Sequence, residues 1–271
     1  MKIIYISESQ IPSQSANSIH VMKMCNAMVE MGHDVTLIGI ENQIEISNIH
    51  QYYGVSDKIK LELIQQSKLR YINQIINGKK IKRIVKSLKP DLLIGRSLSG
   101  FYFCSNIGIP YIFESHEPIL NKNYKLNGKF FKVLMLKKIL GSKNIKSFVL
   151  ISEELKRLYD FSSFPDLKVV VAHDGADIYN LNDRVNLQGD SNKLKVGYLG
   201  KFFRGRGIDL IINIAKELPD FDFHLVGGTK DDLKNYYPNV VQPSNVFFYG
   251  FINPADAYKY RNSFDILLAP Y

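Results

Sequence analysis

Residues 2–39 read KIIYISESQIPSQSANSIHVMKMCNAMVEMGHDVTLIG, and this stretch alone establishes the fold class. Two apolar runs, residues 2–6 and 34–39, have the length and composition of buried strands. Between them, residues 17–32 place apolar side chains every three or four positions, which predicts an amphipathic helix ended by Gly32. A strand, a helix and a strand at this spacing form a β-α-β unit, so we expect a parallel sheet with right-handed crossovers.

The same alternation continues to the end of the chain. Helix-like patterns recur between short apolar runs that we expect to be strands, at residues 91–95, 110–113, 148–151, 168–172, 194–200, 221–227, 245–250 and 264–270. The sequence therefore predicts an α/β protein with two Rossmann-like domains: an N-terminal domain over residues 1–180, a polar linker over 181–193, and a C-terminal domain over 194–271.

The C-terminal domain is expected to be incomplete. It has fewer than 80 residues, whereas doubly wound domains usually need about 100–150. The chain also stops just after a predicted strand, where the carboxyl end of that strand should help to build a site.

Composition excludes several classes of protein. The chain has 271 residues, of which 45% are hydrophobic and 23% charged, so it is globular rather than disordered. It contains no apolar run near the roughly 18–20 residues that a spanning helix needs, and its start does not resemble a signal peptide. Two cysteines are too few for a disulfide framework or a four-cysteine zinc site. We expect a soluble, cytoplasmic protein.

The net charge of +9 is unevenly distributed. Residues 58–146 contain 19 lysines and arginines and only 4 acidic residues. A partner of this region should be anionic, and lipid headgroups, phosphates and nucleic acid all fit that description. Nucleic acid is the least favoured, because no recognisable RNA- or DNA-binding module accompanies the charge.

The motif GKFFRGRG, residues 200–207, follows a predicted strand and leads into a predicted helix. Its glycines allow a tight turn, the helix N-terminus favours an anion, and Lys201 and Arg206 add positive charge. A diphosphate fits this chemistry, although an ordinary turn with solvated lysine and arginine side chains is an equal alternative. Gly227 and Gly228 follow the next strand, where they would admit a nucleotide base or simply form a tight turn.

Several motifs together resemble glycosyltransferase family 4, the retaining, nucleotide-sugar-dependent enzymes with two facing Rossmann-like domains (the GT-B architecture). The family's G-R-x-x-x-x-K-G turn matches Gly200-Lys201 and Arg206-Gly207, with Arg and Lys exchanged. Other stretches resemble the family in order along the chain: NSIHVMKMCNAMVEMGHDVTLI (17–38), ISEELKRLY (151–159), VVVAHDGADIYNL (169–181) and NVFFYGFINPADAYKYRNSFDILLAPY (245–271).

The resemblance implies roles for individual residues. It implies that Gly200, Lys201 and Arg206 bind the diphosphate of the donor, and that His116 is an active-site histidine near the junction of sugar and acceptor. It also implies candidate contacts with the donor or the acceptor. These are Ser15, Asn17 and His20 in the first loop and helix, Glu117 beside His116, and the glycines Gly175, Gly227 and Gly228. A surface position is the alternative for His20, and a structural hydrogen bond for His116.

Two departures from the family pattern bear on activity. The first loop reads Ser15-Ala16-Asn17-Ser18 where the family carries a glycine pair. The family's donor-binding glutamates, in E-x-x-G…E-A-M-A, lie beyond the stretch that Ala269-Pro270-Tyr271 resembles. We therefore expect this chain alone to lack part of its donor pocket.

No metal or other cofactor is expected. Asp220-Phe221-Asp222 spells the D-x-D of metal-dependent glycosyltransferases, but it falls between a helix and a strand, where a solvated turn is the better interpretation.

Residues 122–146 contain eight lysines, no acidic residue and several large apolar side chains. This composition predicts an amphipathic helix that docks on an anionic membrane, with a core helix bearing solvated lysines as the alternative. The expected membrane contacts are Lys129, Phe130, Phe131, Lys132, Lys137 and Lys138.

We therefore expect a bacterial glycosyltransferase that moves a hexose-type sugar, with retention, from a nucleotide-diphosphate sugar to a lipid-linked or polysaccharide acceptor. This reaction would serve cell-surface glycan biosynthesis at the inner face of the cytoplasmic membrane. The alternative is a catalytically incomplete GT-B remnant that binds a membrane or a partner protein.

Overall fold

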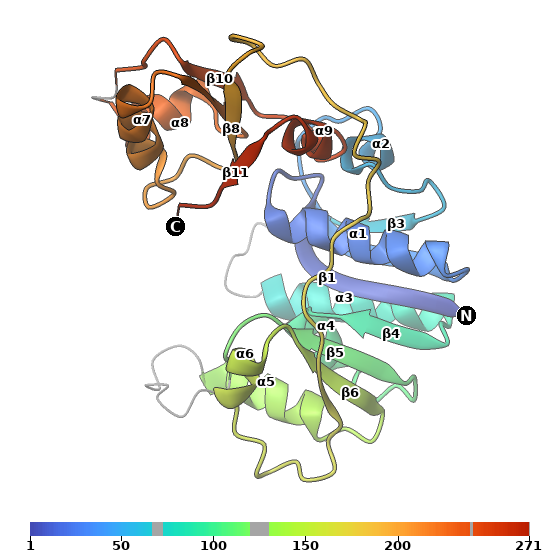
Figure 1. Ribbon diagram of the computed structural model, residues 1–271. Coiled ribbons are helices and arrows are strands. Elements are labelled where there is room, and N and C mark those ends of the chain that lie inside the picture. Colours follow the sequence, from blue (N-terminus) through green and yellow to red (C-terminus); the bar gives the residue numbers. More distant parts are fainter. Residues whose placement is uncertain (67–72, 120–129, 239–240, 271) are drawn as a thin grey trace. The chain divides into compact units, whose positions relative to one another are not determined.

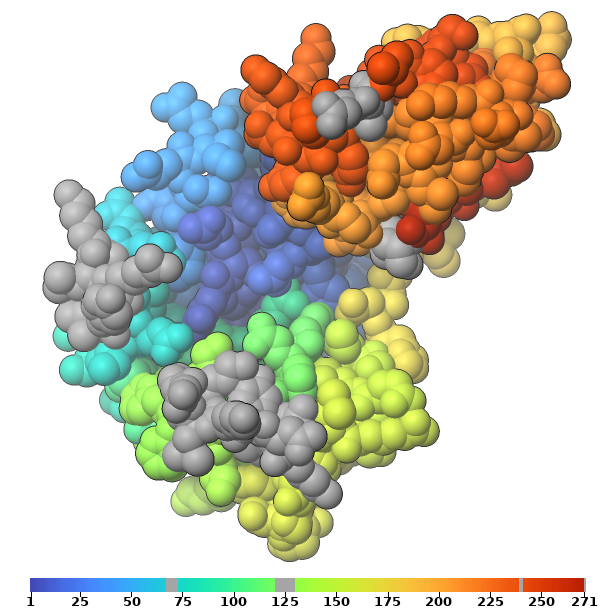
Figure 2. Space-filling model, turned by 90° about the vertical axis from the view of Figure 1, so that its left-hand side faces the viewer, coloured from blue at the N-terminus to red at the C-terminus, as the bar shows by residue number. Residues whose placement is uncertain are grey.

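The computed structural model describes residues 1–66, 73–119, 130–238 and 241–270, and the chain divides into two compact units. Unit 1 contains residues 1–51 and 55–176, and unit 2 contains residues 52–54 and 177–271 (Figure 1). The space-filling view shows one face of the molecule, coloured from blue at the N-terminus to red at the C-terminus (Figure 2).

The elements up to residue 171 alternate between strands and helices, as the sequence predicted. In chain order they are β1 (Lys2–Ile11), α1 (Ala16–Glu30), β2 (Asp34–Glu41), α2 (Ile49–Tyr53), β3 (Lys60–Ile64), α3 (Asn73–Leu88), β4 (Leu92–Gly95), α4 (Leu98–Cys104), β5 (Tyr111–Ser115), α5 (Phe130–Leu140), β6 (Ile145–Leu150), α6 (Glu153–Arg157) and β7 (Val169–Val171).

The sheet of unit 1 has the strand order β3-β2-β1-β4-β5-β6-β7, and every described pair is parallel. Strand order reverses between β1 and β4, because the chain builds outward from β1 to β3 and then returns to place β4 on the other side. With right-handed crossovers, α1 covers one face of this sheet, and α3, α4 and α5 cover the other (Figure 1).

Apolar side chains from the strands and from both layers of helices form the core of unit 1. Phe101 of α4 packs edge-on against Phe113 of β5, which in turn stacks on Phe148 of β6. All three rings are essentially without exposed surface. Each such buried side chain stabilises the fold by roughly 1.5–3 kcal/mol relative to exposure.

The sequence did not predict β3, and the reason lies in its burial. Only Ile64 of this strand is buried, since β3 is an edge strand with polar residues at alternate positions. A search for continuous apolar runs finds central parallel strands and misses an edge strand of this kind.

The strands from residue 194 onward form the second sheet, in the order β10-β9-β8-β11, again with parallel pairs, and helices alternate with them along the chain. They are β8 (Leu194–Leu199), α7 (Ile208–Glu217), β9 (Phe221–Val226), α8 (Lys230–Tyr236), β10 (Val246–Gly250), α9 (Ala257–Asn262) and β11 (Ile266–Leu268).

The core of unit 2 lies between its sheet and α7. Ile208, Ile211 and Ile212 of α7 are buried against Phe223 and Leu225 of β9. The predicted linker over 181–193 lies within unit 2, where Val185 and Gln188 donate backbone hydrogen bonds to Ser263 Oγ and the Tyr249 hydroxyl.

None of the helices among the described residues is both long enough and apolar enough to cross a bilayer.

Candidate active site

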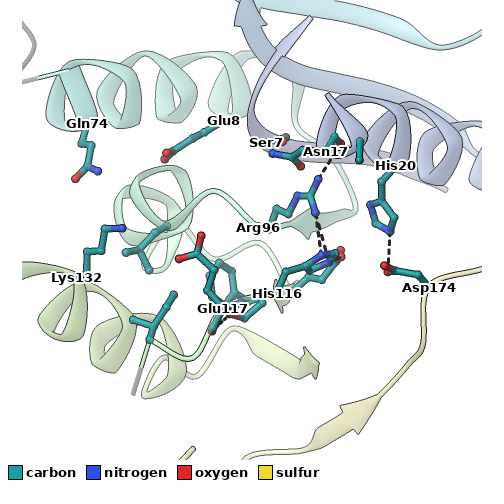
Figure 3. Close-up of a pocket in the computed structure, with 16 residues that line it drawn as sticks. Ser7, Glu8, Asn17, His20, Gln74, Arg96, His116, Glu117, Lys132 and Asp174 are labelled. Carbon is teal, nitrogen blue, oxygen red and sulfur yellow. Dashed lines mark hydrogen bonds and ion pairs between the residues drawn. The ribbon is translucent and has the colours of Figure 1, made fainter. Parts of the chain in front are cut away.

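A cavity of about 570 Å³ opens in unit 1 at the carboxyl ends of β1, β4 and β5 (Figure 3). This is the point at which strand order reverses, and ligands of doubly wound sheets bind in the crevice there. The volume lies within the range of small-molecule sites. The polar and charged side chains that line it are Ser7, Glu8, Asn17, His20, Gln74, Arg96, Glu114, Ser115, His116, Glu117, Lys132 and Asp174.

Gly95 at the end of β4 turns Arg96 into this cavity. Its φ of +138° is a conformation that favours glycine, and a Cβ there would lie 2.2 Å from the carbonyl oxygen of Ile6. The same oxygen accepts hydrogen bonds from the backbone N–H groups of Arg96 (3.0 Å) and Ser97 (3.3 Å). The close approach of β4 to β1 therefore requires glycine and fixes where the arginine begins.

The first two turns of α1 form one wall of the cavity. Ser15 caps the helix by accepting a hydrogen bond from the N–H of Ser18 and does not line the cavity. The carbonyl oxygen of Asn17 accepts a hydrogen bond of 2.9 Å from Arg96 Nη2. His20, one turn further, lies in the cavity with its Nε2 3.2 Å from Asp174 Oδ1.

Two of the three candidate residues of this segment, Asn17 and His20, thus lie in the cavity, and His20 is not the surface residue that was its alternative. Gly175 follows Asp174 and is exposed, with no atom near the position of a Cβ.

Glu8 forms the wall next to α4. Its Oε1 accepts hydrogen bonds from the hydroxyls of Ser97 (2.9 Å) and Ser99 (2.7 Å), beside the N-terminus of α4. A carboxylate is stabilised at this end of a helix, where the unpaired N–H groups and the helix dipole favour negative charge.

His116 follows β5 and is held by two side chains. Its Nε2 donates a hydrogen bond to the carboxylate of Glu114. Arg96 Nη1 lies 3.2 Å from Nδ1 and 3.4 Å from Nε2. The neighbouring Glu117 lines the cavity, but the carboxylate bonded to the imidazole belongs to Glu114, which the sequence analysis did not single out.

Two titratable groups of this cluster are shifted from their ordinary pKa. Burial lowers the pKa of His20, and the nearby charges of Glu114 and Asp174 only partly oppose this effect. Burial alone would raise the pKa of Glu114, but the hydrogen bond and charge of His116, the hydrogen bond from Tyr5 and the charge of His20 together leave the pKa below its ordinary value. At neutral pH Glu114 is therefore ionised and His20 is neutral.

His20, Glu114 and His116 are the group among the described residues whose spacing could suit a metal ion, since one ligand atom of each lies within 4.8 Å of the others. The guanidinium of Arg96, however, contacts His116, and the His116 Nε2 is already bonded to Glu114. A divalent cation placed here would face a fixed positive charge at close range. The arrangement fits a hydrogen-bond network better than a metal centre.

The glycine-rich turn of unit 2 lies between β8 and α7. Gly205 and Gly207 have φ of +83° and +68°, and Gly207 is the N-cap of α7. Lys201 and Arg206 are half-buried in this turn. Lys201 Nζ lies 5.3 Å from the centre of the Phe203 ring.

Gly227 and Gly228 lie against the same turn from the end of β9. A Cβ on Gly227 would be 2.7 Å from the carbonyl oxygen of Gly200, and one on Gly228 would be 1.9 Å from the Phe202 ring. Close packing therefore explains why both residues are glycine. The turn and the two glycines gather at the carboxyl ends of neighbouring strands, which is the ligand-binding edge of such a sheet.

The interpretation of residues 220–222 as a solvated turn is wrong for Asp222. This residue belongs to β9, is only 3% exposed, and accepts a hydrogen bond of 2.7 Å from the N–H of Asp190. Its carboxylate anchors the segment that precedes β8, which is a structural role.

The prediction of one helix over residues 122–146 is also wrong in its extent. Helix α5 ends at Leu140, and β6 begins at Ile145, because Leu136, Ile139 and Leu140 are buried in the core and the chain must then enter the sheet. Residues 122–129, with Lys129 among them, lie outside the described residues.

The basic side chains of α5 have different surroundings. Lys132 lines the cavity and Lys137 is exposed. Lys138 Nζ lies 4.2 Å from the centre of the Tyr102 ring. Phe130 and Phe131 are about half exposed, at 57% and 49%.

Five further cavity residues were not predicted from the sequence: Glu8, Gln74, Arg96, Glu114 and Asp174. A usable signal existed for two of them. Arg96 directly follows a predicted strand, and Glu114 precedes His116 by two residues, so that both side chains point to the same side of the extended chain. Gln74 comes from α3, which the sequence analysis did not predict, and only the fold brings it to the cavity.

Comparison with protein families gives one match. Residues 13–112 match the model of the family described as glycosyl transferase 4-like. The matched segment contains α1, Arg96, the strands β2, β3 and β4, and the start of β5. A search among curated proteins finds no match to the sequence.

Solved structures match over nearly the whole chain. HepE of Anabaena, crystallised with UDP and glucose, is 12% identical with a TM-score of 0.66, covering 98% of this chain and 73% of HepE. WaaG, a glycosyltransferase involved in lipopolysaccharide biosynthesis, is 11% identical with a TM-score of 0.61, covering 99% and 74%. UDP-GlcNAc 2-epimerase of Neisseria meningitidis, bound to UDP-GlcNAc, is 12% identical with a TM-score of 0.57, covering 96% and 75%.

These matches confirm two expectations. The chain has the GT-B fold with two Rossmann-like domains, and residues 13–112 are similar to the glycosyl transferase 4-like family. The epimerase shares the fold, so the fold alone does not select the reaction.

Proposed function

We propose that this glycosyltransferase 4-like chain transfers a hexose-type sugar, with retention, from a nucleotide-diphosphate sugar to a lipid-linked or polysaccharide acceptor. The observation that carries the proposal is the cavity at the strand-order reversal of unit 1, where Asn17, His20 and Arg96 of the segment that matches the family line the same space as His116. The match to a glycosyltransferase family favours transfer over epimerisation, since both reactions occur on this fold.

The chemistry of the cavity suits a carbohydrate acceptor. Its walls present carboxylates, amides and cations, with Glu8, Asn17, Gln74, Glu117 and Lys132 among them. Such groups can satisfy a sugar hydroxyl both as donor and as acceptor, because carboxylates accept hydrogen bonds, ammonium groups donate them and amides do both. His116 would then stand at the reaction centre, as the family resemblance implies.

The donor would bind in unit 2. Lys201 and Arg206, in the turn that leads into α7, would hold the diphosphate, and Gly200, Gly227 and Gly228 would allow the nucleotide to approach the backbone. Two fixed cations supply the charge that a metal ion supplies in metal-dependent transferases, so the reaction should need no metal. A chelator such as EDTA should therefore leave the rate unchanged.

The cell-surface assignment rests on α5 and on one relative. Phe130, Phe131 and Leu134 expose apolar surface next to Lys137 on a single helix, which suits a membrane interface. WaaG acts in lipopolysaccharide biosynthesis. A site at the inner face of a bacterial cytoplasmic membrane would meet both cytosolic nucleotide sugars and lipid-linked acceptors.

The first experiment measures release of nucleoside diphosphate from UDP-glucose, UDP-galactose, UDP-N-acetylglucosamine and GDP-mannose, with and without a bacterial lipid extract as acceptor. UDP-glucose is the first donor to try, because HepE was crystallised with UDP and glucose. His116→Ala should lower the rate by roughly a hundredfold or more with little change in Tm, since positioned histidines contribute about 10²–10⁴.

His33→Ala is the matched control, because His33 lies in the turn after α1 and does not line the cavity. It should keep the wild-type rate. Retained activity in His116→Ala would make that histidine structural. Donor binding without turnover on any donor would instead favour a binding module, and the anomeric configuration of the product decides retention.

A further inference from the structure

His116 has two ring nitrogens, and the protein treats them differently. Nε2 points at the Glu114 carboxylate, while Nδ1 is the nearer of the two to Arg96 Nη1, at 3.2 Å. The same guanidinium is tied to α1, because its Nη2 donates to the carbonyl oxygen of Asn17. The histidine is thus fixed from two sides.

Glu114 is a buried carboxylate with two donors. Its side chain is 8% exposed, and it accepts a hydrogen bond of 3.0 Å from the hydroxyl of Tyr5 as well as the one from His116. Tyr5 has no exposed surface. These bonds, together with the charges of His116 and His20, outweigh burial and hold the pKa of Glu114 below its ordinary value, so the group is ionised and can only accept. The hydrogen between Glu114 and His116 therefore sits on Nε2.

We propose that Glu114, braced by Tyr5, is a positioning residue that holds His116 in its Nε2–H tautomer, so that Nδ1 is the nitrogen that accepts a hydrogen bond from a substrate hydroxyl. This inference rests on the proposed function, since it takes His116 as the histidine of the reaction centre. It adds which atom of the ring meets the substrate, which direction the hydrogen bond takes, and which residues impose that choice.

Arg96 supports the direction of this bond. Arg96 Nη1 lies 3.2 Å from Nδ1 and 3.4 Å from Nε2, and a guanidinium can only donate. Because Nε2 gives its hydrogen to Glu114, Nδ1 is the ring nitrogen that can accept from Arg96. An N–H of Arg96 lies at the place that a substrate O–H would take. The substrate hydroxyl would replace one donor by another and leave the tautomer unchanged.

The second histidine of the cavity provides an internal control. His20 lies 5.1 Å from His116 between ring centroids, but its Nε2 pairs with a different carboxylate, that of Asp174. A change at Glu114 should therefore affect His116 and leave the tautomer of His20 as it was. A change at Asp174 should do the reverse.

The test observes the ring nitrogens directly, by NMR of protein labelled with ¹⁵N-histidine, with His116→Ala and His20→Ala used for assignment. Wild type should show His116 as the Nε2–H tautomer. Glu114→Gln keeps the size of the side chain but can also donate, so His116 should become a mixture of tautomers while His20 stays unchanged. Asp174→Asn should alter His20 alone.

An Nδ1–H tautomer for His116 in the wild-type spectrum would overturn the proposal, whether or not the variants fold. An unchanged His116 tautomer in Glu114→Gln would overturn it as well. Tyr5→Phe removes only the brace, and His116 should remain mainly Nε2–H.

Activity gives a second, separable readout. Glu114→Gln should lower the transfer rate by about ten- to a hundredfold, as loss of an orienting partner commonly does, with Tm nearly unchanged. A purely structural glutamate would lower Tm and activity together without moving the tautomer. If no donor is turned over, the proposed function fails, while the NMR result still decides the role of Glu114.

Discussion

His224 is a buried residue outside the candidate site whose surroundings determine how it titrates. It belongs to β9 and has no exposed surface, and its ring stacks between Phe247 and Phe264. The Tyr249 hydroxyl accepts a hydrogen bond from the N–H of Gln188 and lies 3.0 Å from His224 Nδ1. Burial lowers the pKa of His224 to about 4, well below its ordinary value of 6.5.

This residue should make unit 2 sensitive to acid. The unfolded chain takes up a proton near pH 6.5 and the folded one only near pH 4, so the contribution to stability is complete above pH 6.5 and is lost as pH falls toward 4. Between pH 7 and pH 5 the loss should be roughly 1–2 kcal/mol of unfolding free energy. We expect His224→Phe to unfold with a weaker dependence on pH than wild type.

Denaturant unfolding followed by circular dichroism at the two pH values measures this difference. His33→Phe serves as the control, because it removes a histidine that is not fully buried, and it should keep the wild-type dependence. The same acid-induced loss in His224→Phe and wild type would assign the sensitivity to other groups.

At the scale of elements, the turn from β8 into α7 carries the donor-binding proposal. Replacing Lys201 and Arg206 together by alanine should weaken binding of UDP at least tenfold, since a hydrogen bond to a charged group is worth about 1.5–3 kcal/mol. Calorimetry with UDP, GDP and ADP measures the effect. Lys216→Ala removes a cation from the last turn of α7 and should bind as wild type does. Undiminished affinity in the double variant would show that the turn does not hold the diphosphate.

Elements differ in how far the sequence reveals them. The central strands β1, β2, β4, β5 and β6 are apolar runs buried by helices, so their composition predicts them. The edge strand β3 has mixed composition and is defined by pairing with β2, whereas α3 has an apolar face at helical spacing, with Ile81 and Val85 buried. The glycine-rich turn after β8 was predictable because its φ values require glycine.

The candidate site was predictable in part for a related reason. His116 and His20 are found from motifs, because motifs record residue types at fixed spacing. The partners Tyr5, Arg96 and Glu114 come from separate segments and meet only when β1, β4 and β5 lie side by side. Asp174 reaches His20 from the segment after β7. Which carboxylate binds which histidine is therefore a property of the fold and not of any local pattern.

At the scale of the whole molecule, the range of residues 58–146, with its excess of positive charge, includes α5 and its exposed aromatic rings. We expect the protein to float with anionic liposomes more than with neutral ones, and less at high salt. Each lysine near an anionic surface contributes about 1 kcal/mol, and salt screens exposed charges beyond about 8–10 Å. Liposome flotation at low and high salt measures both effects.

Phe130→Ser/Phe131→Ser and Lys137→Glu should each reduce recovery with anionic liposomes. Leu210→Ser is the control, since Leu210 is equally exposed but lies on α7 of unit 2. Equal recovery on neutral and anionic liposomes would mean that the basic side chains of this region are solvated and do not bind lipid headgroups.

Gly95 has a consequence for how mutational maps of this protein should be interpreted. It has no functional group and touches no ligand, yet any side chain there would collide with the Ile6 carbonyl and separate β4 from β1. Arg96 would then leave its place beside His116, and activity would disappear at a residue with no chemistry of its own. Loss of activity on substitution of Gly95 would therefore report the space that the site needs between β4 and β1, and not a chemical role of the residue.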